Sequence, residues 1–288
     1  MPEPPSSPTP IPMKRTLSIL PLLLTTGSAL AQSPAPAPAP IQDNSFLIEE
    51  AYNQESGVVQ HVSAMSLAEG GRAWAYGFTQ EWPIFGRRHQ ASYTLALQNE
   101  GESFGRGVGV GDVALHYRYQ LAGVDGGPLA VAPRVSVLLP TGDAERGRGA
   151  GGAGVQVNLP ISLVLSPVLV AHTNAGATLT PAARDVDGNE ARTTGVNLGQ
   201  SLVWLAHPKA NLMLEAAWTR DEEVVGPGER ASGNSFFLSP GVRFAIDFPS
   251  GLQVVPGVAV PIGIGPSSGE RGVFLYLSLE HPYSRAAR

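Results

Sequence analysis

Histidines are the residues of this 288-residue chain best suited to acid–base or metal chemistry, and there are six of them. His172 has the most useful neighbours, because Thr173 and Asn174 follow it and supply a hydroxyl and an amide. However, the sequence contains no Gly-x-Ser-x-Gly turn and no two histidines at metal-ligand spacing. The absence of cysteine excludes thiol catalysis and thiolate metal sites. We therefore expect no enzyme, no cofactor and no metal site, and keep a lipid-acting enzyme at His172 as the last alternative.

Two glycine-rich runs and one acidic run superficially match ligand-binding loops. Residues 105–111 and 147–154 share parts of a nucleotide-binding pattern, but no strand–helix unit surrounds them, so ordinary loops are expected. Residues 185–190 carry the acidic and amide side chains of a calcium loop without its 12-residue ligand spacing. A weak surface Ca²⁺ site at residues 185–190 stays open.

The composition is that of a chain that is short of charge yet has no membrane helix. Hydrophobic residues make up 43% and charged residues only 15%, whereas a soluble domain has about 25% charged residues. Past the N-terminus, no apolar stretch reaches the roughly 18 residues that a membrane helix requires. The net charge of −5 gives no basic surface for nucleic acid. What remains is a β-rich protein that is exported or associated with a membrane.

Residues 1–31 are predicted to be a leader that contains a secretory signal peptide. Two basic residues and a short apolar stretch follow Met13, the preferred start, and small residues precede a cleavage site after Ala31. Residues 32–45 are rich in proline and alanine and are expected to form an extended linker. The mature chain is therefore predicted to be exported.

Beyond residue 57, apolar and polar residues alternate with period two, as in strands that have one apolar face. Each stretch has about ten residues, the length of a tilted strand that crosses a membrane. Prolines cannot donate ladder hydrogen bonds, so bulges or strand ends are expected at Pro133, Pro240, Pro256 and Pro261. The predicted strands are residues 58–67, 74–84, 90–98, 108–121, 129–139, 154–163, 166–174, 196–205, 210–219, 235–248, 252–262 and 273–280.

The connections between these strands alternate in length. Even-numbered strands precede short turns, whereas odd-numbered strands, except the first, precede polar, glycine-rich loops at residues 99–107, 141–152, 176–192, 220–234 and 263–272. Outer-membrane barrels have short periplasmic turns and longer extracellular loops, and only a closed barrel satisfies the backbone of strands in lipid. The sequence therefore predicts an all-β fold: an antiparallel transmembrane (outer-membrane) β-barrel of about 12 strands with meander topology, over residues 46–283, followed by a C-terminal tail at 284–288.

If the apolar strand faces meet lipid, the opposite faces line the lumen and carry its charges. Isolated charges in a dry interior would be costly, so they must be hydrated or paired. They could form the walls of a selective polar channel or a salt-bridged network that merely fills the barrel, and both remain open. The predicted lumen-lining residues are Glu81, Asp112, His116, Arg118, Arg134, Glu215, Arg243, Asp247 and Glu280.

Several segments of the chain resemble a known group of outer-membrane barrels. They are residues 46–55, 57–61, 78–83, 109–115 and 133–143. In these segments the chain is similar to the transporter-like barrels grouped with the phenol-degradation MetA-pathway proteins, and the likeness spans most of the mature chain. The resemblance implies an outer-membrane barrel. One departure is that such barrels tend to end on an aromatic residue, whereas here Tyr283 is followed by further residues.

We expect a channel or transporter for small compounds, including hydrophobic or aromatic ones, in the outer membrane of a bacterium. The main alternative is a closed structural or surface-interaction barrel without transport, which presents the loops at 176–192 and 220–234. Residues 46–55 either begin the first strand or enter the lumen as a plug. Expected partners are outer-membrane lipid, the barrel-assembly and periplasmic chaperone machinery, and a small hydrophobic substrate, with no nucleic acid.

Overall fold

The computed structural model describes residues 41, 45–71, 73–99 and 107–283. All of these described residues belong to one compact unit. The predicted signal peptide, the tail, and the predicted linker apart from residues 41 and 45 lie outside the described residues. No helix in the described part of the chain is long and apolar enough to cross a membrane.

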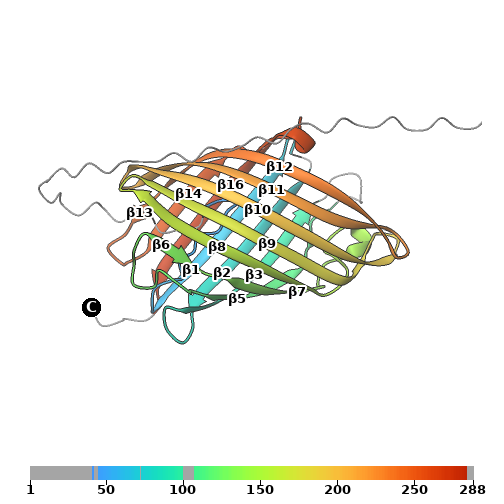
Figure 1. Cartoon of the computed structure of the whole chain (residues 1–288), viewed down its shortest axis with the longest axis horizontal. Helices are drawn as coiled ribbons and strands as arrows, with labels where there is room; N and C mark the ends of the chain where they lie inside the picture. The colour runs from blue at the N-terminus through green and yellow to red at the C-terminus, as the bar shows by residue number, and fades with distance from the viewer. Residues whose placement is uncertain (1–40, 42–44, 72, 100–106, 284–288) are drawn as a thin grey trace, which may run out of the picture. The chain divides into compact units, whose positions relative to one another are not determined.

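Antiparallel strands in sequential order close into a 12-stranded barrel (Figure 1). Pairing of the first strand with the last closes the ring, from Val58 opposite Pro282 to Ala68 opposite Gly272. The prediction of an all-β, antiparallel barrel of about 12 strands with meander topology is confirmed. The strands are β1 (Val58–Ala68), β2 (Trp74–Pro83), β3 (His89–Asn99), β4 (Gly109–Val110), β5 (Val113–Tyr119), β6 (Leu129–Val131), β7 (Arg134–Leu139), β8 (Gly154–Ser166), β9 (Leu169–Arg184), β10 (Glu190–His207), β11 (Ala210–Gly226), β12 (Glu229–Phe244), β13 (Ile246–Asp247), β14 (Gln253–Ala259), β15 (Ile262–Gly263) and β16 (Gly272–Pro282).

Several membrane-spanning strands are interrupted, so that two short strands together form one strand of the barrel. These pairs are β4 and β5, β6 and β7, and β14 and β15, while β13 continues β12. Pro133 lies in the break between β6 and β7, and Pro261 lies in the break between β14 and β15. A proline has no N–H to donate to the neighbouring strand, which explains a break at these places. Pro240 and Pro256, by contrast, remain inside β12 and β14.

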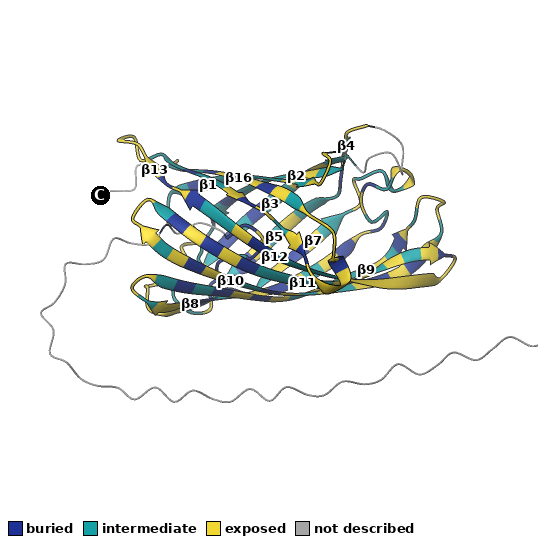
Figure 2. Ribbon diagram, turned by 90° about the horizontal axis from the view of Figure 1, so that it is seen from above, coloured by how far each residue is buried: buried dark blue, intermediate teal, exposed yellow. Residues whose placement is uncertain are grey.

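The barrel wall has an apolar outer face and a mostly polar inner face. Along β10, the outward side chains of Leu198, Leu202 and Trp204 are 55%, 41% and 52% exposed, whereas those of Ser201 and Val203 are buried. Figure 2 shows this alternation as bands of exposed and buried residues along the strands. A continuous apolar surface of this kind is the lipid-facing band of a transmembrane barrel.

The loops predicted at residues 176–192 and 220–234 are wrong, because most of these residues belong to strands. The strands β9 and β10 continue to a turn at residues 185–189, and β11 and β12 meet at residues 227–228. Long connections after odd-numbered strands remain at residues 140–153, with the 3₁₀ helix η1 (Ala144–Arg146), and at residues 264–271, with η2 (Gly265–Ser267). The predicted loop at 99–107 lies mostly outside the described residues.

The ends of these two hairpins are rich in charged residues and glycine and lack a regular apolar alternation, which is why they read as loops. Arg184 pairs with Glu190 across the first hairpin (3.1 Å), and Arg230 pairs with Glu222 across the second (3.0 Å). The alternation that marks a membrane strand requires lipid on one face, and beyond the apolar band both faces meet water. Backbone pairing and cross-strand side-chain pairs therefore continue where the hydrophobic pattern stops.

An apolar cluster lies inside the barrel at the level where the chain before β1 enters it. Inward-facing residues of six strands contribute to it together with residues that precede β1. The cluster shows that the lumen is occupied by the chain itself. Its buried members are Ile41, Phe46, Val62, Val170, Val203, Met213, Ala245, Val255, Ala259, Phe274 and Tyr276.

Candidate functional site

Residues 45–56, here called the plug segment, run through the interior of the barrel. Polar side chains of the wall accept hydrogen bonds from the backbone N–H groups of the segment. These bonds run from Leu47 and Ile48 to Glu215 (3.0 and 3.3 Å), Glu49 to Asn174 (2.8 Å), Ala51 to Ser162 (2.8 Å), Asn53 to Gln120 (3.0 Å) and Gln54 to Gln90 (2.8 Å). Because β3, β8, β9 and β11 lie on different sides of the closed ring, a segment bonded to all of them must cross the lumen. The segment is thus a plug and not part of the first strand.

The backbone carbonyls of the plug segment are also bound by the wall. Arg118 donates to the carbonyls of Glu50 (3.3 Å) and Tyr52 (2.5 Å). Gln120 donates to the carbonyl of Ala51 (3.1 Å). An extended segment without a neighbouring strand must find other partners for its buried backbone groups. Inward-facing side chains of the wall provide them, so the inner surface is built to hold this segment.

Acidic residues of the plug segment neutralise arginines of the wall. Glu49 lies 2.6 Å from Arg134, and Glu50 lies 3.1 Å from the fully buried Arg243. Within the wall itself, Arg118 lies 3.8 Å from the carboxylate of Glu81. Sequence reasoning missed Glu49 and Glu50 as functional residues. Their signal is an acidic pair in an apolar run just before a series of strands with inward arginines.

Most of the predicted lumen-lining residues point to the inside of the barrel. His116 contacts Thr94, Ser136 and Arg134 through its ring nitrogens (3.0, 2.7 and 2.7 Å). These wall residues surround the plug segment, and several of them touch it directly. The set that faces inward is Glu81, His116, Arg118, Arg134, Glu215 and Arg243.

The remaining predicted lumen-lining residues are Asp112, Glu280 and Asp247. Asp112 accepts hydrogen bonds from the backbone of Gly142 (3.0 Å) and Ala150 (2.7 Å), and so fixes the loop at 140–153. Glu280 is half-buried on the inward side of β16 near the end of that strand. Asp247 is exposed at the rim, where it pairs with Lys209 (3.7 Å). Strand parity places its face correctly, but β13 ends at this residue and the side chain reaches the turn beside it.

A glycine-lined socket holds the aromatic ring of Phe46. The ring lies 5.6 Å from that of Phe274 and 5.3 Å from that of Tyr276, centroid to centroid. A Cβ atom at Gly241 or Gly257 would lie only 2.6 or 2.5 Å from the ring. These two glycines therefore leave the space that the ring occupies, and the wall and the plug segment fit each other in shape as well as in charge.

His172, the one histidine with catalytic neighbours in the sequence, takes part in holding the plug segment. Its Nδ1 lies 2.7 Å from the hydroxyl of Ser162, and its Nε2 lies 3.6 Å from the carboxylate of Glu50. This serine, histidine and acid superficially match a hydrolytic triad. However, the Ser162 hydroxyl accepts the Ala51 N–H, both side chains are buried, and the adjoining cavity has about 10 Å³, no more than one water requires. The arrangement leaves no room for a substrate beside the hydroxyl.

In the acidic turn at residues 185–189, the carboxylate of Asp185 accepts hydrogen bonds from other residues of the turn. Asp185 accepts hydrogen bonds from the side chain and backbone of Asn189 (both 2.8 Å) and from the backbone of Asp187 (3.0 Å). The side-chain hydrogen bond from Asn189, together with the backbone bonds, lowers the pKa of Asp185. Within the described residues, no group of three or more histidine or acidic side chains is placed to hold a metal ion.

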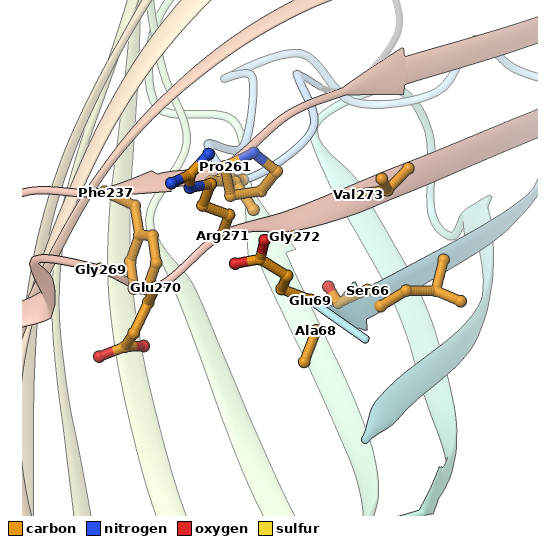
Figure 3. Close-up of a pocket in the computed structure, with 12 residues that line it drawn as sticks. Ser66, Ala68, Glu69, Phe237, Pro261, Gly269, Glu270, Arg271, Gly272 and Val273 are labelled. Carbon is orange, nitrogen blue, oxygen red and sulfur yellow. The ribbon is translucent and has the colours of Figure 1, made fainter. Parts of the chain in front are cut away.

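Cavities lie in the lumen next to the plug segment. A polar cavity of about 320 Å³ and a mixed cavity of about 260 Å³ both border Leu47, Ile48, Glu49 and Arg134. A larger cavity of about 490 Å³ lies at the rim near the 264–271 loop (Figure 3) and also includes Leu47. On the other side of the segment, beside Glu50, the space shrinks to the cavity of about 10 Å³. The plug segment is therefore the floor of the open part of the lumen.

No model of a known protein family matches the chain. No curated protein matches its sequence. Among solved structures, it is similar to an outer-membrane channel from Pseudomonas putida F1, with a TM-score of 0.54 and 14% identity over 81% of this chain and 97% of that chain. It is also similar to the NanC porin, with a TM-score of 0.51 and 8% identity over 77% of this chain and 98% of that chain. These likenesses show that the chain has the fold of an outer-membrane β-barrel.

Proposed function

We propose that this protein is an outer-membrane channel for small compounds, including hydrophobic or aromatic ones, whose lumen is closed by the plug segment. One observation carries the proposal: Arg134 and Arg243 of the wall pair with Glu49 and Glu50 of the plug segment, which belongs to no strand of the barrel. A barrel that only needed to be filled could pair its charges within its own wall. Here release of one segment would open the lumen without breaking any strand pairing.

The proposal places the protein in the outer membrane of a bacterium. Its apolar outer band fits lipid, and its fold is shared with proteins described as a porin and an outer-membrane channel. Export by the leader at residues 1–31, insertion by the barrel-assembly and periplasmic chaperone machinery, and kinship with the MetA-pathway barrels belong to the same proposal. The likeness in segments such as residues 46–55, which form most of the plug segment, supports the kinship.

A disulfide between the plug segment and the wall tests the proposal. The hydroxyl oxygens of Ser45 and Ser201 lie 3.1 Å apart and both side chains are buried. Since the chain has no cysteine, the double variant Ser45→Cys/Ser201→Cys offers a single pair for a bond of about 2.0 Å after a small shift. Oxidised protein is expected to show no conductance in planar bilayers and no solute uptake in proteoliposomes, and a reductant is expected to restore both.

The single variant Ser45→Cys is the matched control, because it loses the same hydroxyl and cannot form the bond. Equal conductance of the oxidised double variant and the control would show that the plug segment does not gate the lumen. Complete absence of conductance and uptake in the reduced protein would favour the closed structural barrel instead.

A further inference from the structure

The cavity of about 490 Å³, here called the mouth cavity, lies inside the barrel at the rim where β1 ends and β16 begins. It is bounded by β1, β12, β16 and the connection at 264–271 (Figure 3). Ser66 and Ala68 of β1 and Phe237 of β12 occupy inward positions, in step with the buried Val62 and Ser239 on the same strands. The size lies within the range of about 300–1,000 Å³ that is usual for small-molecule sites.

The walls of the mouth cavity are mainly apolar and include an aromatic ring. Phe237, Leu47 and Pro261 contribute side chains to it, and Figure 3 shows the ring of Phe237 at one side of the cavity. An aromatic ligand would pack against this ring in an offset or edge-to-face arrangement. Ser66 supplies a hydroxyl that can donate or accept one hydrogen bond. One aromatic surface and one hydroxyl among apolar walls are suited to an aromatic molecule that carries at most a hydroxyl group.

The charges of the mouth cavity stand at its edge and disfavour an anion. Among the described residues of the lining, the charged side chains are those of Glu69, Glu270 and Arg271, and all three are exposed. A carboxylate or sulfonate would have to leave water for apolar walls beside the carboxylates of Glu69 and Glu270. An uncharged molecule escapes both costs.

The mouth cavity also touches the plug segment. Leu47, whose N–H is held by Glu215, forms part of its lining, and Phe46 beside it fills the glycine-lined socket. An occupant of the cavity therefore lies against the segment that closes the lumen. This position, on the open side of the plug segment, is where a solute would arrive before passage.

We propose that the mouth cavity is the capture site of the channel, where one uncharged aromatic molecule of one or two rings, with at most a hydroxyl substituent, binds against Phe237 and Leu47. The inference rests on the proposed function, since it names the substrate class of that channel and the place where the substrate first binds.

Protection of an introduced cysteine tests the capture site. The full chain carrying Ala68→Cys is placed in proteoliposomes and labelled from the outside with a water-soluble maleimide, with and without 2-naphthol. At ten times its dissociation constant, 2-naphthol is expected to slow labelling about tenfold, because it leaves about a tenth of the sites empty. The anion 2-naphthalenesulfonate, which has the same two rings, is expected to give no protection at that concentration.

Ala231→Cys is the matched control, because Ala231 is exposed at the tip of the β11–β12 hairpin outside the cavity. Its labelling must stay constant, which excludes an effect of 2-naphthol on the membrane. Addition of Phe237→Ala to the Ala68→Cys chain is expected to raise the 2-naphthol concentration needed for equal protection about tenfold. This is the loss expected for an aromatic contact of about 1.4 kcal/mol.

The same proteoliposomes separate failure of the inference from failure of the proposed function. If the Ala68→Cys protein takes up 2-naphthol but is not protected from the maleimide, the capture site is overturned and the channel is left standing. Equal protection by the sulfonate overturns the assigned ligand class. Protection without any uptake supports the site and overturns the channel.

Discussion

Removal of the Phe46 ring gives the most direct measure of how firmly the lumen is closed. The side chain is 9% exposed and packs against two aromatic rings of β16. Truncation of a buried phenylalanine to alanine costs about 3 to 5 kcal/mol. Since the strand pairings of the wall do not involve Phe46, this loss falls on the docking of the plug segment. At the lower figure, Phe46→Ala raises the ratio of released to docked segment about 150-fold, because each 1.4 kcal/mol is tenfold.

Chemical labelling reads this ratio even when release is rare. A cysteine at position 45 replaces a buried serine, so a maleimide reaches it only when the segment leaves its place. When the segment returns faster than it reacts, the labelling rate is proportional to the released fraction. The rate in the Ser45→Cys background is therefore expected to rise about 100-fold or more with Phe46→Ala, and the open probability in planar bilayers is expected to rise with it.

The matched control is Phe244→Ala, the same truncation at a side chain that is 46% exposed on the outer face. It is expected to leave the labelling rate unchanged. Heat-modifiable migration in detergent gels shows that each barrel is folded. A folded Phe46→Ala protein whose labelling rate stays within about threefold of its parent would refute the role of the ring, since that corresponds to less than about 0.7 kcal/mol.

Further predictions concern the charge, the socket and the acidic turn. Glu50→Gln removes the carboxylate charge that faces the buried Arg243. Breaking a buried pair costs about 3 kcal/mol or more, so labelling of position 45 is expected to accelerate about 100-fold or more, and an unchanged rate would contradict the pairing. Gly257→Ala places a methyl group against the Phe46 ring and is expected to destabilise docking of the plug segment by about 1 kcal/mol or more, which accelerates labelling about fivefold or more. Gly233→Ala, where a Cβ atom would have nothing within 4 Å, is expected to have no effect. The pKa of Asp185 is lowered chiefly by the side-chain hydrogen bond from Asn189 and also by backbone hydrogen bonds within the turn. These bonds therefore stabilise the turn fully above the ordinary aspartate pKa, and their contribution is lost as the pH falls through the lowered pKa. Protection of the amides of residues 185–189, measured against the intrinsic exchange rate at each pH, is expected to fall only below that ordinary pKa, and a fall between pH 7 and pH 5 would contradict it.

Strand positions were predictable because lipid and lumen impose opposite chemistry on alternate residues. In β10, Leu198 and Trp204 face lipid while Ser201 faces the interior, and this contrast is written in the sequence itself. Beyond the apolar band the contrast disappears, so the outer parts of β11 and β12, such as Glu222 and Arg230, read as loop although their backbones remain paired. Local periodicity therefore locates the membrane part of a strand and misses its extension into water.

The alternation of side chains along each strand also predicted that Arg134 and Arg243 face inward, but it could not predict which residues they contact. Alternation says which side of the wall a residue faces and nothing about what crosses the lumen. Glu49 and Glu50 belong to a segment without regular secondary structure, and its contacts with β7, β9 and β12 join residues about 80 to 200 positions apart. Long-range contacts of single side chains leave no periodic signal. The plug segment could be suspected from its acidic pair, and only the fold could place it.

The charge arrangement also indicates how a released plug segment would return. Release takes the carboxylates of Glu49 and Glu50 away from Arg134 and Arg243 of the wall. Inside a low-dielectric wall these two guanidinium groups attract the acidic segment back, and the glycine-lined socket fixes its register once it arrives. An uncharged solute does not compete with the segment for the arginines, whereas an anion would. The electrostatics that close the lumen are thus compatible with passage of uncharged molecules and with rapid closure behind them.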